Sequence, residues 1–537
     1  MKKPSQPKQR NRRFYAELGW ILGLLLGIAC ASTGCGHSVR GSAENPPKLL
    51  PINFGGKPAR GPLRLAVANS RYFADDLGNV VYLTGSHTWN NLQDWGSADP
   101  PPKFDYDKYL DFLVRHGHNF FRLYVWEEAA GVPWSGEKVW FAPLPYARTG
   151  PGTASDGYPR FNLREWNPQY FERLRTRVRQ AGERGVYVSV MLFNGWSVDG
   201  KRSAMTAELQ KRGLGDPWRG HPFNSDNNMN GIDAGGWGKV HTLQNLAITE
   251  LQKAYVRKVI DTVGDLDNVL WEISNESNHE STAWQYELIR FIHDYEGTRP
   301  KQHPVGMTAE FPGVQNADLW QSPADWISPG SSPGEGGYDT NPPTATGGKV
   351  IVTDTDHIWG IGGSEDWVWK SFTRGLNPIF MDPYEADLIG IYPMYWGRPI
   401  ADPARAEREP LWESIRKNLG FARAFSMRMN LAATTPHGEI ASSGYCLADP
   451  GSKYLVYLPA KRGRRFLRKL PANLFADTVD VDLSRASGDL QFEWFQPDTG
   501  TTIASGQVPG GGKQTFAAPL GGGGLALYIE ATSRGGK

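Results

Sequence analysis

The sequence has little cysteine and little net charge, and each shortage excludes a class of protein. Its 537 residues include three cysteines, Cys30, Cys35 and Cys446. Two of these lie in or beside the amino-terminal leader, so no disulfide framework is predicted for the rest of the chain. The formal net charge is +2, which gives no indication of a nucleic-acid partner. Neither HExxH, nor Walker A, nor paired CxxC motifs occur, and we predict no cofactor and no metal.

Residues 1–35 have the pattern of an export signal. Basic residues in the first 13 positions precede the apolar run Trp20–Ala29, and small residues follow. This run is too short for a comfortable transmembrane helix. Ala29-Cys30-Ala31 fits the A-x-A form of a cleavage site. We therefore predict that this bacterial chain is exported, either to the periplasm, to the cell surface or to the medium.

A second processing signal overlaps the first. Ser32-Thr33-Gly34-Cys35 resembles a bacterial lipobox, although Ser32 occupies a position that is usually aliphatic. A lipid on Cys35 would attach the chain to a membrane as a lipoprotein. Residues 36–61 are rich in Pro, Gly and Ser, which predicts a flexible linker.

Strand and helix patterns alternate over residues 62–432. Asn167-Pro168, for example, combines a capping residue with proline at the first helical position. Eight strand candidates begin near Val80, Asn119, Val186, Val269, Val305, Trp326, Val350 and Ile379. Eight strands separated by helices predict an α/β fold of the (β/α)8 TIM-barrel type. Little helical sequence separates the fifth unit from the sixth.

Residues 433–537 have a different sequence pattern. Short runs with a period of two, such as 453–458 and 490–495, alternate with turn clusters, and no helical periodicity is present. This pattern predicts a small antiparallel β-sandwich.

The stretch Asn268–Asn278 carries the strongest indication of chemistry. It reads NVLWEISNESN, an apolar run that suits a buried strand and ends abruptly in polar residues. The carboxyl ends of the strands of a (β/α)8 barrel surround its active site. Glu276 is therefore expected at the mouth of the barrel, where it can donate a proton.

The other predicted strand ends carry further candidates. They are His87, Trp89 and Asn90 on the first strand, Arg122 and Trp126 on the second, Asn194 and Trp196 on the third, Asn275 on the fourth, Glu310 on the fifth, Asp354, Asp356 and His357 on the seventh, and Asp382 and Tyr384 on the eighth. Carboxylates from the fourth and seventh strands would point across one cleft. Cleavage of a glycosidic bond needs such a pair, one to protonate the leaving oxygen and one to attack or to activate water.

Structural roles for the same residues stay open at this point. Glu276, Asp354 and Asp356 could each cap a helix or turn, and the histidines could be structural hydrogen-bonding residues. The sequence has 20 tryptophans, 21 tyrosines and 23 phenylalanines. Their abundance fits a sugar-binding cleft or simply a large core.

Two further motifs lack the context that their chemistry needs. Residues 330–334 match G-x-S-x-G, but Pro333 and the following glycines exclude the helix that must follow the serine. Residues 226–231 imitate the start of a calcium loop, but Trp237 stands where the bidentate glutamate belongs.

Several stretches together resemble a known family. RYFADDLGNVVYLTGSHTWNNLQDW, NFFRLYVWE, VLWEISNES and VTDTDHIWG are similar to a bacterial family of cellulase-like or apiosidase-like glycoside hydrolases of clan A, which are retaining enzymes on (β/α)8 barrels. KYLVYLP, FEWFQPDTGT and LALYIE resemble a small C-terminal domain labelled collagen-binding. The resemblance covers roughly residues 64 to 530.

The resemblance implies roles for individual residues. Glu276 would be the acid/base, Asn275 would hydrogen-bond the sugar 2-hydroxyl, and Arg122 would steady the nucleophile. The clan has a glutamate on the seventh strand where this chain has Asp354-Thr355-Asp356. Asp356 is favoured as nucleophile because it adjoins His357 at the strand end, with Asp354 as the alternative.

Two functions follow from these observations. The first is an exported retaining hydrolase of poly- or oligosaccharides, with Trp89, Trp126, Trp196 and Tyr384 lining its subsites. Glu310 would be a reserve carboxylate. The replacement of glutamate by aspartate motivates the second, a catalytically inactive surface protein that binds carbohydrate or matrix.

Overall fold

The computed structural model describes residues 38–198, 204–331, 337–384, 403–460, 477–520 and 524–532. The predicted signal and Cys35 lie outside these residues. The chain divides into two units, Met1–Ser38 and Val39–Lys537, and the second contains all the elements below. No helix in the described ranges has the length and apolarity needed to cross a membrane.

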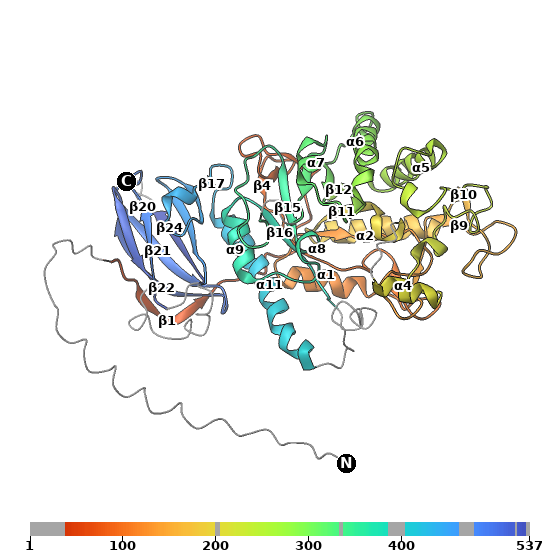
Figure 1. Ribbon diagram of the computed structural model, residues 1–537. Coiled ribbons are helices and arrows are strands. Elements are labelled where there is room, and N and C mark those ends of the chain that lie inside the picture. The colour runs from red at the N-terminus through yellow and green to blue at the C-terminus, as the bar shows by residue number, and fades with distance from the viewer. Residues whose placement is uncertain are drawn as a thin grey trace, which may run out of the picture. The chain divides into compact units, whose positions relative to one another are not determined.

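Eight parallel strands form the predicted barrel (Figure 1). In spatial order they are β5 (Gly85–His87), β16 (Asn377–Met381), β15 (Val350–Asp354), β14 (Trp326–Ser328), β13 (Val305–Thr308), β12 (Val269–Asn275), β11 (Tyr187–Asn194) and β7 (Phe120–Leu123). The N–H groups of Asn119 and Phe120 donate to the carbonyl of Thr84 at 2.9 and 3.1 Å. These bonds link the first strand to the last and nearly close the ring.

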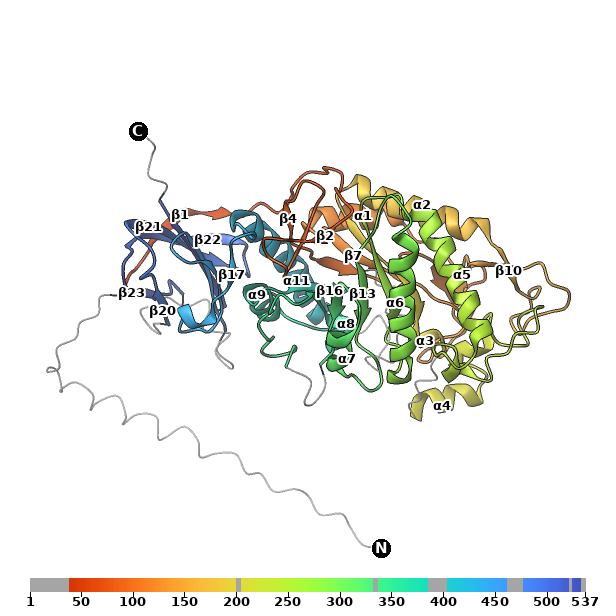
Figure 2. The same cartoon turned by 90° about the horizontal axis from the view of Figure 1, so that it is seen from above.

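Helices cover the outside of the strand ring. The main ones are α1 (Tyr106–Arg115), α2 (Pro168–Glu183), α5 (Leu246–Val263), α6 (Thr282–Glu296), α7 (Asn316–Gln321), α9 (Glu365–Thr373) and α11 (Pro403–Arg428). The short α3 (Gly195–Val198), α4 (Ala204–Lys211) and α8 (Thr355–Ile358) lie in the segments that follow β11 and β15. Helices α2, α5 and α6 lie next to one another (Figure 2). Asn167 caps α2 by accepting from the N–H of Gln169, as its sequence predicts.

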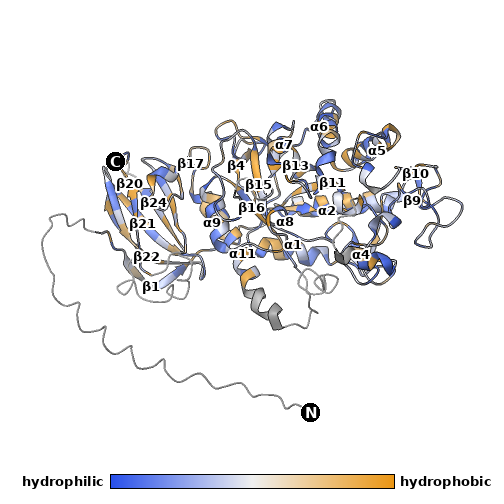
Figure 3. Ribbon diagram, viewed as in Figure 1, coloured by the Kyte–Doolittle hydropathy of each residue, from blue (hydrophilic) through white to orange (hydrophobic). Residues whose placement is uncertain are grey.

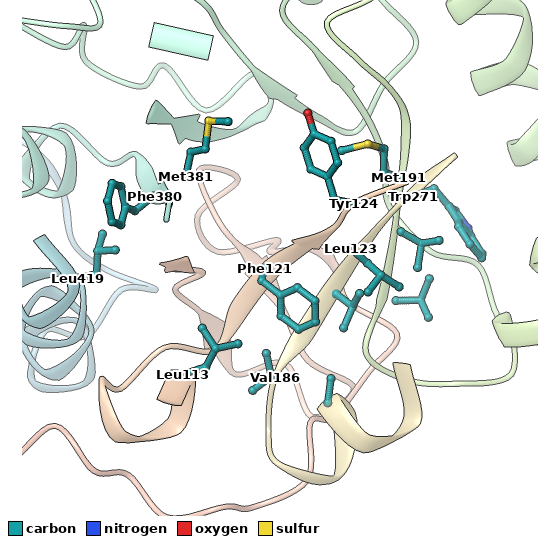
Figure 4. Packing of buried hydrophobic residues seen from close by; sticks show 14 of the residues in the cluster. Leu113, Phe121, Leu123, Tyr124, Val186, Met191, Trp271, Phe380, Met381 and Leu419 are labelled. Carbon is teal, nitrogen blue, oxygen red and sulfur yellow. The ribbon is translucent and has the colours of Figure 1, made fainter. Parts of the chain in front are cut away.

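The strand pleat separates an outer packing layer from the barrel interior. Phe121 and Leu123 of β7 point toward Leu113 of α1 and Val186 (Figure 4). Phe120, the residue before Phe121, belongs to a separate apolar cluster inside the ring. Because side chains alternate along a strand, Arg122 shares the inner face with Phe120.

The same alternation builds two layers inside the barrel. The lower layer is apolar and includes Phe120, Leu270 and Val352. Two residues further along each strand stand Arg122, Glu272 and Asp354. β15, which carries Val352, is visibly apolar in Figure 3. The polar layer therefore lies at the carboxyl ends of the strands, and the apolar layer lies directly beneath it.

The first barrel strand differs from the prediction. Val80–Val81 (β4) pairs with β3 (Phe73–Ala74) and, through it, with β2 (Arg64–Leu65) in a small separate sheet. β5 takes the barrel position instead. An added Cβ on Gly85 would lie 2.1 Å from the carbonyl oxygen of Phe120. The close approach of the two strands thus requires glycine at position 85. Because glycine is uncommon within strands, the sequence pattern did not indicate β5.

The C-terminal region forms the predicted antiparallel sheets. One has the order β1 (Ser42–Leu49), β22 (Thr501–Pro509), β21 (Asp489–Gln496), β24 (Leu525–Ala531), β19 (Lys453–Leu458), β18 (Cys446–Asp449) and β17 (Thr435–Pro436). The other pairs β20 (Thr478–Asp482) with β23 (Lys513–Ala517). Cys446 is buried in the core between them, as a free thiol.

β1 corrects the prediction of a linker over residues 36–61. Its backbone pairs with β22, and the register shifts between Ala43 and Lys48, across Pro46 and Pro47. Proline lacks a backbone N–H and is tolerated at the edge of a sheet. The composition of this segment indicated no strand because the pairing depends on the backbone of a distant partner.

Short strands occupy the segment between β7 and α2. They are β8 (Trp140–Ala142), which pairs with β6 (Asp94–Gly96), and β9 (Tyr146–Ala147), which pairs with β10 (Asn162–Trp166). Single-turn 3-10 helices span Pro217–Gly220, Trp237–Lys239, His279–Ser281 and Gly438–Ile440.

Candidate active site

Arg122 is the centre of a buried ionic cluster at the mouth of the barrel. Its Nη1 lies 2.9 Å from Oδ2 of both Asp354 and Asp356, and its Nε and Nη2 donate to Glu272 at 2.5–3.2 Å. Burial lowers the pKa of Arg122, but the charges of Glu272 and Asp354 outweigh it and raise that pKa well above its ordinary value. The guanidinium is therefore a fixed positive charge.

Asp354 ends β15 and is wholly buried. It accepts from Nε2 of His87 at 2.9 Å and from the backbone N–H of Asp356 at 3.0 Å, in addition to Arg122. Burial raises its pKa, but the charges of His87 and Arg122 hold it below the ordinary range. Asp354 is thus an ionised residue whose oxygens are already occupied by partners.

Asp356 stands in the first turn of α8, with 5% of its side chain exposed. Burial raises its pKa well above the ordinary range, and the charge of Glu276 raises it further, against the opposing effect of Arg122. Arg122 donates to Asp356 at 2.9 Å and to Asn275, the residue before Glu276, at 2.6 Å. The ends of the fourth and seventh strands therefore meet at one site.

Glu276 follows β12 directly and is 7% exposed. Its φ of 48° is the only left-handed value among non-glycine residues in the described ranges. The indole N–H of Trp196 donates to its Oε2. An added Cβ on Gly195 would lie 2.3 Å from the Glu276 carbonyl oxygen, so this turn requires a glycine beside it. Strained residues of this kind persist where the surroundings hold them, frequently at functional sites.

Asn275 connects Arg122 to aromatic and imidazole groups. Its Oδ1 accepts from Nη2 of Arg122 at 2.6 Å and lies 3.3 Å from Nε2 of His357, and its Nδ2 donates to the hydroxyl of Tyr124 at 2.6 Å. His357 is held at Nδ1 by Ser328, at 2.8 Å. The amide orientation is therefore fixed from three sides.

A second polar network supports the turn at Glu276 from behind. Oγ of Ser277 lies 2.8 Å from Nδ1 of His241, whose Nε2 lies 3.1 Å from Oε1 of Glu127. His221 contacts the other oxygen of Glu127 at 3.3 Å. Burial raises the pKa of Glu127, but the charges of the two histidines lower it to about 2. This network joins three loops to the residue that follows Glu276.

An aromatic rim adjoins Glu276. The ring of Trp196 stacks on Phe311 at 6.0 Å and meets Trp134 edge-on at 4.9 Å. Phe311 is 42% exposed, so it is accessible to a ligand at the mouth.

Five predicted site residues lie outside the cluster, within the packing of the fold. Trp89 and Trp126 are fully buried, and the indole N–H of Trp126 donates to the carbonyl of Trp89. Asn90 is buried beside them, 6% exposed. Asp382 forms an ion pair with Arg416 of α11 at 2.6 Å. Tyr384 packs on Phe112 of α1 at 4.7 Å.

Asn194 and Glu310 flank the cluster without joining it. Asn194 accepts from the N–H of Trp196 and so fixes the start of α3. Glu310 accepts from the hydroxyl of Thr282 at 2.5 Å, and burial raises its pKa to about 7. The cluster itself therefore unites His87, Arg122, Asn275, Asp354, Asp356 and His357, with Glu276 and Trp196 beside it.

Glu272 and the hydrogen-bond network of Ser277, His241 and Glu127 were not predicted from the sequence. Glu272 carried a usable signal, because a carboxylate inside the apolar run VLWEI needs a buried cation. No sequence pattern indicated His241, Glu127 or Ser277. His241 reaches Ser277 only because the insertion after β11 folds back onto the turn at Glu276.

Three potential cation ligands occur in the cluster. Ligand atoms of Asp354, Asp356 and His357 lie within 4.8 Å of one another. Nη1 of Arg122 already stands 2.9 Å from both aspartates. The chain's own guanidinium therefore already binds an oxygen of each aspartate that a metal would need.

The fold is shared with glycoside hydrolases of known structure. A protein described as a glycoside hydrolase superposes with a TM-score of 0.54 at 13% identity, over 88% of this chain and 98% of that chain. A family 5 glycoside hydrolase from Bacteroides vulgatus gives a TM-score of 0.51 at 12% identity, over 89% of this chain and 96% of that chain. No protein-family model matches the sequence, and no curated protein matches it.

Proposed function

We propose that this protein is an exported glycoside hydrolase that cleaves poly- or oligosaccharides with retention of configuration. One observation carries the proposal. Asp356 and Asn275, the residue before Glu276, both accept hydrogen bonds from the buried Arg122 at the mouth of one barrel, which supports a single site for Glu276 and Asp356. Hydrolysis of a glycosidic bond by two carboxylates requires this arrangement.

Asp356 is the proposed nucleophile. Asp354 is wholly buried and bound to His87, Arg122 and a backbone N–H, so it supports the site and does not attack. Asp356 keeps 5% of its side chain exposed and is bound by Arg122 at 2.9 Å. Arg122 stabilises the carboxylate form of Asp356, which is the leaving group when the glycosyl-enzyme breaks down.

Glu276 is the proposed acid and later base. A retaining mechanism needs a proton on Glu276, where it is given to the leaving oxygen. Asn275 donates one amide proton to Tyr124, which leaves the second for a sugar 2-hydroxyl.

Export and the C-terminal sheets belong to the proposal as expectations. The leader pattern supports export, and a lipid at Cys35 would attach the chain to a membrane. We expect the C-terminal sandwich to be a spacer or a carbohydrate-associated module. A pull-down with collagen and with glycans tests that expectation.

Replacement of Glu276 by Gln tests the catalytic role. A screen of plant and microbial polysaccharides with product analysis first identifies the sugar. The variant should lose about 10²–10⁴-fold in turnover of that saccharide, because general acid catalysis contributes this much. The first step with a dinitrophenyl glycoside should be nearly unaffected, because its leaving group needs no proton. Rapid-mixing absorbance measures that step.

Glu310→Gln is the matched control, because Glu310 stands at the end of the neighbouring strand outside the cluster. It should leave both reactions near wild-type rates. Equal losses on both substrates in Glu276→Gln would refute the acid role. Proton NMR of the first product should show the retained anomer, and the inverted anomer would refute the nucleophilic role of Asp356. Binding without any product, unchanged in Glu276→Gln, would support the carbohydrate-binding alternative.

A further inference from the structure

A hollow lies apart from the Arg122 cluster. It has a volume of about 780 Å³ and lies between α2 and the segment that contains β8, β9 and β10. None of the residues in the ionic cluster lines it. Its volume falls in the range of cavities that hold small-molecule ligands.

One wall of this groove is aromatic and rigid. Trp140 and Tyr158 meet edge-to-face, with centroids 6.3 Å apart. The hydroxyl of Tyr158 donates to Asp99 at 3.0 Å, while 45% of the residue stays exposed. Lys138 packs 3.7 Å over the ring of Trp140. Tyr158 is thus held in place with its ring accessible, and the half-buried Trp140 supports it from the side.

The opposite wall is a polar face of α2. Gln169, Glu172, Thr176 and Gln180 line the groove. Their spacing of three or four residues places them in one row along the helix. The row offers amide, hydroxyl and carboxylate groups opposite the aromatic wall.

The charges in the groove cancel. Arg148, Arg173 and Arg177 line it together with three acids, Asp99, Asp156 and Glu172. Most of these charges are also used within the protein. Arg148 forms an ion pair with Asp156, Arg173 pairs with Asp94 at 2.9 Å, and Arg177 donates to the carbonyl of Asn91 at 2.5 Å. The groove therefore suits an uncharged ligand.

We propose that this groove binds a neutral polysaccharide at a distance from the cleavage site. A pyranose presents C–H groups to an aromatic ring and hydroxyls to amides, which matches the two walls. Phe141, the neighbour of Trp140 on β8, packs on the buried Trp126 at 4.9 Å, so the aromatic wall rests on the hydrophobic core of the barrel. This inference rests on the proposed function, and it implies that long chains are the preferred substrates.

The test is affinity electrophoresis of the full chain in gels that contain galactomannan, xyloglucan or arabinoxylan. The wild type should be retarded by at least one of these polymers. The double variant Trp140→Ala/Tyr158→Ala should bind that polymer at least fivefold more weakly, because both rings of the aromatic wall are gone. A second variant, Gln169→Ala/Thr176→Ala, removes groups from the other wall and should also bind more weakly.

Trp320→Ala is the matched control, since Trp320 is 38% exposed and does not line the groove. It should bind as the wild type does. Melting temperatures verify that the variants are folded. Retardation of the aromatic double variant equal to that of Trp320→Ala would overturn the proposal. So would a wild type retarded by polygalacturonate and by none of the neutral polymers.

Binding is measured without turnover, so it separates this inference from the proposed activity. If the protein hydrolyses the polymer, kcat/KM of the aromatic double variant should fall on the polymer and stay unchanged on an aryl glycoside. An equal fall on both substrates would contradict a separate groove. If no saccharide is hydrolysed, the proposed activity fails while the gel result still decides the groove.

Discussion

Two aspartates two residues apart acquire different chemistry from their surroundings. Asp354 projects into the barrel interior, where His87 and Arg122 hold it ionised. Asp356 stands two residues later, in the first turn of α8, where burial and the charge of Glu276 raise its pKa. The difference between a supporting carboxylate and a reacting one arises here from neighbours, since the side chains are identical.

Removal of each aspartate separates the two roles. Asp356→Ala should lose nearly all hydrolysis, because no group remains to attack the anomeric carbon. Azide should restore cleavage of an aryl glycoside and yield a glycosyl azide of inverted configuration, which NMR identifies. Asp354→Ala should also be impaired, but azide should not rescue it. A rescue confined to Asp354→Ala would exchange the two assignments.

At the level of elements, the turn after β12 is held from several sides. A left-handed non-glycine residue costs roughly 1–2 kcal/mol, and the contacts around Glu276 offset this cost. Gly195 packs against its carbonyl, Trp196 binds its carboxyl group, and Ser277 is bound through His241 to Glu127. Loops from three different strands thereby position one carboxyl group.

His241→Gln tests that support. It should lower kcat on a saccharide by about tenfold, equivalent to about 1.4 kcal/mol, with little change in KM. The loss should be smaller on a dinitrophenyl glycoside, because the substitution impairs proton donation by Glu276 and this leaving group needs no proton. Ser277→Ala should behave in the same way.

A buried histidine elsewhere provides the comparison for His241. His303 is also bound to a buried glutamate, Glu296, at 2.8 Å, but it does not contact the turn at Glu276. His303→Gln should lower stability without dependence on the leaving group. If His241→Gln and His303→Gln show the same kinetics, the support has no catalytic consequence.

At the level of the whole molecule, the barrel and the sandwich share one hydrophobic core. Trp369 of α9 stacks on Tyr457 of β19 at 6.0 Å, and Phe425 of α11 contacts Phe495 of β21 at 5.1 Å. These residues belong to the same buried cluster as the outer layer of the barrel. We therefore expect the two parts to unfold together.

A buried acid makes the stability of this molecule depend on pH. Burial raises the pKa of Glu128 to about 8. The unfolded chain ionises this group near its ordinary pKa, so the folded state loses stability as pH rises from about 4.5 to about 8. Glu128→Gln should remove this loss and gain roughly 3–5 kcal/mol over the wild type at pH 8, but almost nothing at pH 4.

Denaturant unfolding across that pH range measures the difference between the two proteins. Glu172→Gln is the control, because it makes the same substitution at an exposed position. A constant difference for Glu128→Gln would contradict a neutral buried acid at position 128.

Much of the fold was predictable because it depends on local patterns. Asn167-Pro168 starts α2, and the apolar run before Asn275 is a buried strand. The eight-unit alternation gave the barrel, and period-two runs gave the C-terminal sheets. β5 and β1 were not predicted. β5 depends on the close approach of Gly85 to Phe120, and β1 depends on pairing with β22, which is distant in the sequence.

The site divides in the same way. The sequence by itself determined which polar residues end the strands, and thereby placed Arg122, Asn275, Glu276, Asp354 and Asp356 at one mouth. Only the tertiary structure decided that Asp382 pairs with Arg416 and that Trp126 is core. A strand end fixes the level of a side chain along the barrel axis. The hydrogen-bond partners of that side chain, its burial and therefore its charge depend on residues that are distant in the sequence.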